Sequence, residues 1–504
     1  MSGDLSAVRE VWAGRSGART GSDALYLLYM GALSVLVLGV PALRSAGGLL
    51  SRPDVLPALQ HPLAPQIAGS VALIAAAALV LLGAVRGPAL MAPFFTATLA
   101  SSGIRRRTVL RRPYLRALLV PVLSMSVIAS LIAVTLSAAG EGTGGAAAVW
   151  FVLAATGAGL LLGAAWLAGE LLTARPRRLL AGVLLLAAVL SALLPPGTGL
   201  GGAYPLAEAP HRLWALLVLA AGIAAAVAGV ALLDRLRGTV LREQSMRWES
   251  VATVATSGDL AGAAATFRPP PSAGRRLRAI GPRPLVLLYA RRDAVAWLRS
   301  PDRLAVGIVV ALLAAAALAG SSQLTGPLAW SAVLLGAVAL WGAGSTLVEG
   351  IRHGVHTLGA PRLFGQTVAS QVLLHALAPA LLLTVLAALG GGGLVLAGGS
   401  GEGAAQAVML PVALAPVLIA GQVRDAAKGP MPLKLMTPMP TAQGDGSVLV
   451  MLAWQSDALL LALLSGTLLA GLGALGPVWV LGGAVLLTAL MALMARSRLR
   501  ALGS

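Results

Sequence analysis

The chain has 504 residues, of which 58% are hydrophobic and only 11% are charged, and its mean hydropathy is +0.86. A water-soluble protein of this length needs far more charge to cover its surface, so this composition excludes the soluble globular class. The sequence contains no cysteine, which excludes a disulfide framework, a thiolate metal site and a cysteine nucleophile.

Long apolar segments recur along the whole chain, and each approaches the roughly 20 residues that a membrane-spanning helix needs. Residues 1–22 are polar, so the first apolar segment itself serves as the targeting element. The sequence predicts an all-α polytopic membrane protein with about twelve transmembrane helices in two parallel sets of six. The expected spans are 24–43, 67–87, 114–137, 147–171, 178–195, 212–234, 303–320, 328–348, 366–389, 405–423, 447–470 and 476–495.

Positive residues are distributed unevenly around these spans. With a cytoplasmic N-terminus, all but three of the 37 Lys and Arg residues fall on the cytoplasmic side, and the exceptions are Arg44, Arg52 and Arg212. A Lys and Arg bias of this kind sets orientation during insertion. We therefore expect both termini in the cytoplasm. The net charge of +19 follows from this bias and from contact with anionic lipid, and it needs no nucleic-acid partner.

Two further patterns agree with a bacterial plasma membrane protein in this orientation. Indole rings favour the headgroup level of a bilayer, and tryptophans stand at the starts of even-numbered spans, on the outer side. They are Trp150, Trp214, Trp330 and Trp479. The only lysines are Lys428 and Lys434. This preference for arginine is typical of a high-GC bacterial genome.

The two sets of six spans have the same layout. Each set follows an amphipathic, Trp-containing segment and has a longer basic loop between its second and third spans, and Pro121 aligns with Pro379. Equal orientation of the two halves predicts a parallel repeat. The expected segments are an elbow at 1–23, a first half at 24–234, a cytoplasmic helix and linker at 235–283, a second elbow at 284–302, a second half at 303–495 and a basic tail at 496–504.

Few residues could carry out chemistry. A P-loop needs Gly-Lys-Ser/Thr, but the two lysines follow Ala427 and Leu433. The HExxH and GxSxG patterns are absent as well, so we expect no catalytic, metal or cofactor site in this chain.

Polar side chains inside the spans are the candidates for function, because placing them in lipid is costly. Asp457, in the eleventh span, is the only acid well inside a span, and the nearby spans offer no obvious cation. We expect it to face a wet vestibule between the halves. The other candidates for a substrate path are Gln455, Gln371, His375, Ser126 and Ser130. Alternatively, these residues form hydrogen bonds between helices without lining a path.

The loop between the eighth and ninth spans reads VEGIRHGVHTLGAPRLFG (348–365). It resembles the loop after the second span of ABC type-2 exporter permeases, in which an acid is followed by a Gly-Thr pair and a Pro-x-Arg turn. The matching positions are Glu349, Thr357, Leu358, Ala360, Pro361 and Arg362. RRDAVAWLRSPDRLA (291–305) is similar to the amphipathic elbow of the same family. The first-half loop PFFTATLASSGIRRR (93–107) lacks the acid, and Gly103 replaces the turn proline.

The resemblance implies a permease with both membrane halves fused in one chain and two separate ATP-binding subunits that bind ATP and Mg²⁺. Coupling helices at 92–106 and 349–362 would dock on these subunits. The residues implied in coupling are Thr96, Thr98, Arg105, Glu349, Thr357, Pro361 and Arg362. Partners would also include membrane lipid and a hydrophobic small-molecule substrate. Exported substrates in this family are lipophilic or amphipathic, and they include drugs and antibiotics.

Two other functions fit part of the pattern. A secondary transporter of the major-facilitator type also has twelve spans in two parallel halves. Its loop after the second span carries Gly-x-x-x-Asp-Arg-x-Gly-Arg, whereas this chain has SSGIRRRTVLRR (101–112), without an acid. The third alternative is a membrane scaffold without transport activity.

Overall fold

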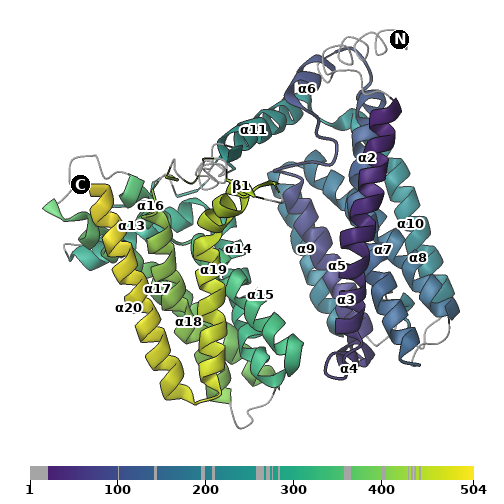
Figure 1. The fold of residues 1–504 in the computed structure, drawn as a ribbon. Coiled ribbons are helices and arrows are strands. Elements are labelled where there is room, and N and C mark those ends of the chain that lie inside the picture. Colours follow the sequence, from purple (N-terminus) through teal and green to yellow (C-terminus); the bar gives the residue numbers. More distant parts are fainter. Residues whose placement is uncertain are drawn as a thin grey trace. The chain divides into compact units, whose positions relative to one another are not determined.

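The computed structural model describes the chain with the exception of residues 1–20, 100–101, 141–144, 194–198, 207–210, 257–265, 268–272, 275, 282–283, 357–364, 399–403, 430, 433–434, 436, 438, 442–443 and 504. The chain divides into two units, Met1–Ala252 and Thr253–Ser504. The described part is almost entirely helical, and eleven of its helices are long and apolar enough to span a membrane. This confirms the prediction of an all-α, multi-pass membrane protein (Figure 1).

Unit 1 begins with one continuous helical segment that contains a π-helical turn, and it ends in the polar helix α11. Its elements are α2 (Gly21–Ser34), η1 (Val35–Gly39), α3 (Val40–Leu50), α4 (Leu56–Gln60), α5 (Ala64–Leu82), α6 (Pro93–Leu99), α7 (Arg106–Ala138), α8 (Gly145–Leu171), α9 (Ala174–Leu193), η2 (Gly199–Ala203), α10 (His211–Leu232), η3 (Leu233–Arg235) and α11 (Gly238–Thr256). The π turn η1 ends just before Pro41, a residue that cannot donate a helical hydrogen bond.

Helix α8 is the centre of unit 1, because it packs against α5, α7 and α10. Glycines allow these close approaches. A side chain at Gly157 would overlap the backbone of α10 around Leu219, and one at Gly169 would overlap the carbonyl of Val80 in α5. Small residues of this kind let membrane helices gain packing contacts that larger side chains would prevent.

Unit 2 begins with α13, which lies outside the spans, and includes a short hairpin before α19. Its elements are α13 (Leu285–Arg299), α14 (Pro301–Gly320), η4 (Ser321–Gln323), α15 (Gly326–Ser345), α16 (Glu349–His356), α17 (Val368–Gly398), α18 (Ala404–Ala426), β1 (Pro440–Thr441), β2 (Gly444–Asp445), α19 (Ser447–Gly473) and α20 (Pro477–Gly503). Strands β1 and β2 pair antiparallel, with Pro440 opposite Asp445.

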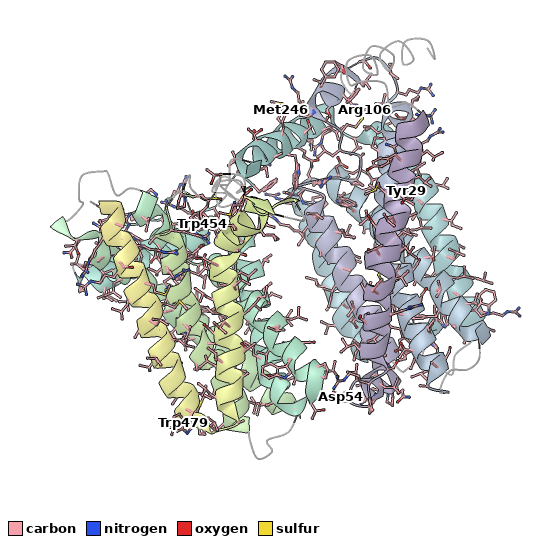
Figure 2. The ribbon with its side chains drawn as sticks, viewed as in Figure 1. Tyr29, Asp54, Arg106, Met246, Trp454 and Trp479 are labelled. Carbon is pink, nitrogen blue, oxygen red and sulfur yellow. The ribbon has the colours of Figure 1, made fainter. Side chains whose placement is uncertain are left out.

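Helix α18 is the centre of unit 2. It packs against α14, α15, α17, α19 and α20, and its side chains Leu414, Val417 and Ile419 are buried in the main core of the unit. Figure 2 shows Trp454, near the start of α19, and Trp479, near the start of α20, toward opposite ends of the unit. Trp479 is exposed, as expected for an indole at the membrane interface.

Several helix pairs correspond between the two units. Helix α7 packs on α8 as α17 packs on α18, α8 packs on α10 as α18 packs on α20, and α5 packs on α9 as α15 packs on α19. The first spans differ. Helix α14 packs extensively on α15 and α17, whereas α3 packs on α7 and has no buried residue.

Among the described residues, eleven of the twelve expected spans are found, and the remaining one ends at residues 194 and 195, which lie outside the described part. The predicted fifth span, 178–195, corresponds to α9, which is not among the eleven apolar helices. Helix α9 begins with Arg175, Arg177 and Arg178, so its described apolar part, 179–193, is shorter than a span needs. The predicted first elbow lies almost wholly outside the described residues, whereas the segment predicted as the second elbow contains a separate helix, α13.

Candidate functional site

Three helices of unit 2 meet around a buried hydrogen-bonded pair of titratable side chains. Asp293 of α13 lies 2.7 Å from Nδ1 of His375 in α17, and the side chains are 2% and 7% exposed. The ring of Tyr289 packs edge-on against the imidazole at 4.7 Å. Burial raises the pKa of Asp293, and the hydrogen bond from His375 opposes this rise. His375, which we predicted to line a substrate path, is thus joined to the elbow.

Helix α16 fits against this pair only because it has a glycine there. A Cβ atom at Gly350 would overlap both Oδ1 of Asp293 and the ring of His375. On the neighbouring turn, Ile351 and Val355 are buried in the core, whereas His353 is exposed. Helix α16 therefore has one face packed against the bundle, and His353 lies on another, exposed face.

Charged and polar contacts attach the first half of α16 to the spans. Glu349 accepts a 3.0 Å bond from Arg303 at the start of α14. Arg352 donates to Oε1 of Gln422 in α18 at 3.2 Å. Helix α13 also bonds to the turn just before α16, because the indole N–H of Trp297 donates to the carbonyl of Leu347 at 2.9 Å. Of the residues implied in coupling on this loop, Glu349 is described, and Thr357, Pro361 and Arg362 lie outside the described residues.

Unit 1 has a short helix, α6, at the corresponding place between α5 and α7. Thr96 is buried, and its hydroxyl donates to the carbonyls of Met91 at 3.2 Å and Ala92 at 3.1 Å. Thr98 donates to the carbonyl of Phe94, and Arg105 stands exposed at the N-cap of α7. The hydroxyl bonds of both threonines are local to α6 and the residues just before it, and the structure does not gather the three predicted residues around one point.

Helix α11 packs on the end of α5, although the sequence indicated only a cytoplasmic helix followed by a tether. The amide of Gln244 donates to the carbonyls of Gly83 and Ala84, each at 3.1 Å. The indole of Trp248 donates to the carbonyl of Val85 at 3.1 Å. These bonds satisfy carbonyls that the end of a helix leaves without an intrahelical partner.

A buried carboxylate, Glu170, lies beside the same turn. It is 4% exposed near the end of α8, and a Cβ atom at Gly87 would overlap its carboxylate. The backbone of Ala89 is close, but neither carboxylate oxygen has a hydrogen bond of good geometry among the described residues. Gly87 and Gly350 are each the fifth residue after a second span, so both loops pass over a buried acid. Sequence analysis missed Glu170 because it stands at the end of its span.

Asp457 is paired, which contradicts the expectation that no cation lies near it. Its carboxylate accepts bonds from Lys428 at 2.6 Å, from Arg424 at 2.8 Å and from Arg498 at 3.3 Å. The side chains of Arg424 and Lys428 are only 6% and 8% exposed. Lys428 also lies 4.0 Å from the ring centre of Trp454. Asp457 therefore neutralises part of a cationic cluster that joins α18, α19 and α20, and its place on a substrate path stays a prediction.

The other predicted path residues are spread over both units. Ser126 of α7 shares a 2.9 Å hydrogen bond with Thr156 of α8, and Ser130 donates to the carbonyl of Ser126. Gln371 donates to the carbonyl of Gln366 at 3.4 Å, and Gln455 is half-buried in α19. The Ser126–Thr156 contact is the interhelical hydrogen bond expected in the alternative interpretation, whereas the bond of Ser130 stays within α7.

No model of a protein family, no curated protein and no solved structure matches this sequence.

Proposed function

We propose that this chain is the membrane-spanning subunit of an ATP-driven exporter in a bacterial plasma membrane, with both termini in the cytoplasm. It moves a lipophilic or amphipathic small molecule, and two separate ATP-binding subunits bind ATP and Mg²⁺ and hydrolyse the nucleotide. The observation that carries this proposal is the attachment of α16. A short helix between two spans is attached to four other helices, α13, α14, α17 and α18, and has an exposed residue, His353.

The contacts of α16 suit it to transmit force. Glu349 connects it to α14 through Arg303, Arg352 connects it to α18 through Gln422, and Gly350 rests on the Asp293–His375 pair of α13 and α17. A partner that displaced α16 would therefore move the inner ends of three spans and the elbow together. Coupling over such distances is carried by packed and hydrogen-bonded elements that move as units.

The corresponding helix of unit 1 supports two docking points. Helix α6 lies between the second and third spans, and the matched helix pairs of the two units favour a duplicated bundle. The two helices differ in charge, because α16 begins with Glu349 whereas α6 has no acidic residue. The two ATP-binding subunits would therefore be held by different contacts, even if they are identical.

The test uses inside-out vesicles from cells that express the chain with its ATP-binding subunits. His353→Arg changes the exposed face of α16 and keeps a favourable i,i+4 spacing to Glu349, so the helix itself should persist. We expect this variant to reduce both co-purified ATPase activity and ATP-dependent accumulation of a fluorescent amphiphile. The control, Gln323→Arg, changes an exposed residue of η4 beyond the opposite end of α14 and should have no effect.

Two results would contradict the proposal. Accumulation that persists without ATP and disappears with a protonophore would indicate a secondary transporter. Normal membrane insertion without co-purified ATPase and without accumulation of any amphiphile would indicate a scaffold.

A further inference from the structure

We propose that a groove between α3 and α7 binds one anionic phospholipid, with an acyl chain along its apolar wall and the headgroup phosphate on Arg44. This inference goes beyond the proposed exporter function and needs no ATP-binding subunit. It rests on three observations: a cavity of suitable size and lining, two glycines that keep it open, and a cation without a partner at its edge.

The cavity has a volume of about 360 Å³ and lies along the length of α3 and the last turns of α7. Its walls include Val40, Leu43, Leu131 and Val134, and they are largely apolar. Small-molecule sites in proteins commonly enclose about 300 to 1,000 Å³ and combine apolar walls with a few polar groups. The groove therefore has the size and the chemistry to hold part of an amphiphile.

Gly47 and Gly48 keep the groove open on the α3 side. A Cβ atom at either position would meet no other atom within 4 Å. The hydroxyl groups nearby are already used, because Ser51 donates to the carbonyl of Gly47 and Thr135 donates to the carbonyl of Leu131. The two glycines thus leave a smooth helix face, which shapes the groove and presents no polar group that would compete for the phosphate.

Among the residues that line the groove, Arg44 is the only one with a formally charged side chain. It belongs to the three basic residues that lie on the otherwise cation-poor side of the predicted topology. The other two have partners in the structure, since Arg52 bonds to Asp54 at 3.0 Å and Arg212 lies 5.4 Å from the ring centre of Trp150. Arg44 is exposed and has no acidic or aromatic partner among the described residues. A guanidinium group binds phosphate oxygens through two parallel hydrogen bonds.

The surroundings of the groove select a lipid over a water-soluble anion. Leu43, Leu49 and Val134 are exposed beside it, and Val134 is 69% exposed. In a membrane such side chains contact acyl chains and not water. An occupant therefore enters from the bilayer with its chain against these residues and its charge at Arg44.

The experiment measures lipids retained by the purified full chain, using native mass spectrometry after exchange into phosphatidylglycerol or phosphatidylcholine. We expect the wild-type chain to retain one phosphatidylglycerol in preference to phosphatidylcholine. Arg44→Gln should lower that retention by about tenfold, the size that a charge-assisted hydrogen bond gives. The matched control is Arg52→Gln, which removes a cation of the same side that already has a partner, and it should change retention little.

A second pair of variants tests the shape of the groove and leaves the charge of Arg44 unchanged. Gly47→Leu fills the space beside Arg44 and should also abolish the preference. Gly31→Leu adds the same side chain to α2, where a Cβ atom likewise meets nothing within 4 Å, and should leave the preference intact. Equal retention of both lipids by the wild type, or unchanged retention in both Arg44→Gln and Gly47→Leu, would overturn the proposal.

Other occupants give different outcomes. Competition by glycerol phosphate as strong as that by phosphatidylglycerol would show an anion site without a lipid component. A dimer that is lost in Gly47→Leu would show that a second copy covers the groove. Either result would replace the phospholipid as the occupant.

Discussion

At the level of single residues, Asp457 balances the charge of three helices. Asp457→Asn removes the carboxylate that accepts hydrogen bonds from Arg424 and Lys428, which are almost fully buried, and leaves only Asp425 nearby to offset their charge. Breaking a buried ion pair on one side typically lowers the free energy of unfolding by about 3 kcal/mol or more. We therefore expect a lower midpoint of thermal unfolding, measured for the detergent-solubilised chain.

Two further variants separate charge from packing. Ser456→Ala changes the neighbouring residue, whose hydroxyl bonds to its own helix, and should leave the midpoint unchanged. Asp457→Asn with Lys428→Met should recover part of the loss, because fewer buried cations then lack a partner. A midpoint equal to wild type in Asp457→Asn, with altered transport of cationic substrates, would instead favour the predicted role in the substrate path.

Two glycines one turn apart on α16 give a matched comparison. Gly350→Ala places a methyl group into the space of Asp293 and His375, and overpacking of this kind costs about 1 to 3 kcal/mol. A Cβ atom at Gly354 meets nothing within 4 Å, so Gly354→Ala should stabilise the helix by up to about 1 kcal/mol. Opposite shifts in the thermal midpoint are the expected result. Equal shifts would show that Gly350 is not in tight contact with the pair.

The partners of the buried acids could not be predicted from the sequence. The local sequence identified Asp457 as a carboxylate inside a span. The basic residues that pair with it are 29, 33 and 41 residues away along the chain. Asp293 is in an amphipathic segment and Glu170 is at a span end, positions where charged residues are usually solvated. Only the packing of α16 and of the turn after α5 makes these two acids buried.

At the level of elements, α11 closes the end of α5. Gln244→Met removes the amide that bonds to the carbonyls of Gly83 and Ala84, and leaves those carbonyls without this donor. Buried acceptors that lose a partner cost about 1 to 3 kcal/mol. We expect faster cleavage of the turn around 83–92 by added protease. The control, Glu243→Gln, affects an exposed residue paired with Arg247 on the same helix and should leave the cleavage rate unchanged.

The elements themselves were largely predictable, because long apolar segments have few alternatives to helices in a membrane. Helix α13 covers most of the predicted elbow at 284–302, as its amphipathic spacing of apolar and charged residues indicated, and its role as an elbow stays a prediction. The contacts of α16 were not predictable. They depend on Arg303 and Gln422, which belong to two different spans, and no local pattern indicates that these side chains meet the loop.

At the level of the whole molecule, the charge bias predicts the sidedness of both units. The chain has no cysteine, so single cysteines can be introduced as probes. Thr325→Cys and Ser137→Cys, both at exposed positions, should react with an impermeant maleimide added to intact cells. Ser497→Cys should react only after permeabilisation. Labelling of Ser497→Cys from outside would reverse the proposed orientation.

The order of synthesis gives the cluster around Asp457 a role during membrane insertion. Arg424 and Lys428 precede Asp457 by 33 and 29 residues. At a synthesis rate of about 5 to 20 residues per second, Asp457 is added to the chain roughly two to seven seconds after the two cations. During this interval the segment that contains Arg424, Asp425 and Lys428 keeps a net positive charge, and in the proposed orientation this charge would hold the end of α18 at the cytoplasmic surface. The later arrival of Asp457 converts this temporary anchor into a permanent junction between helices.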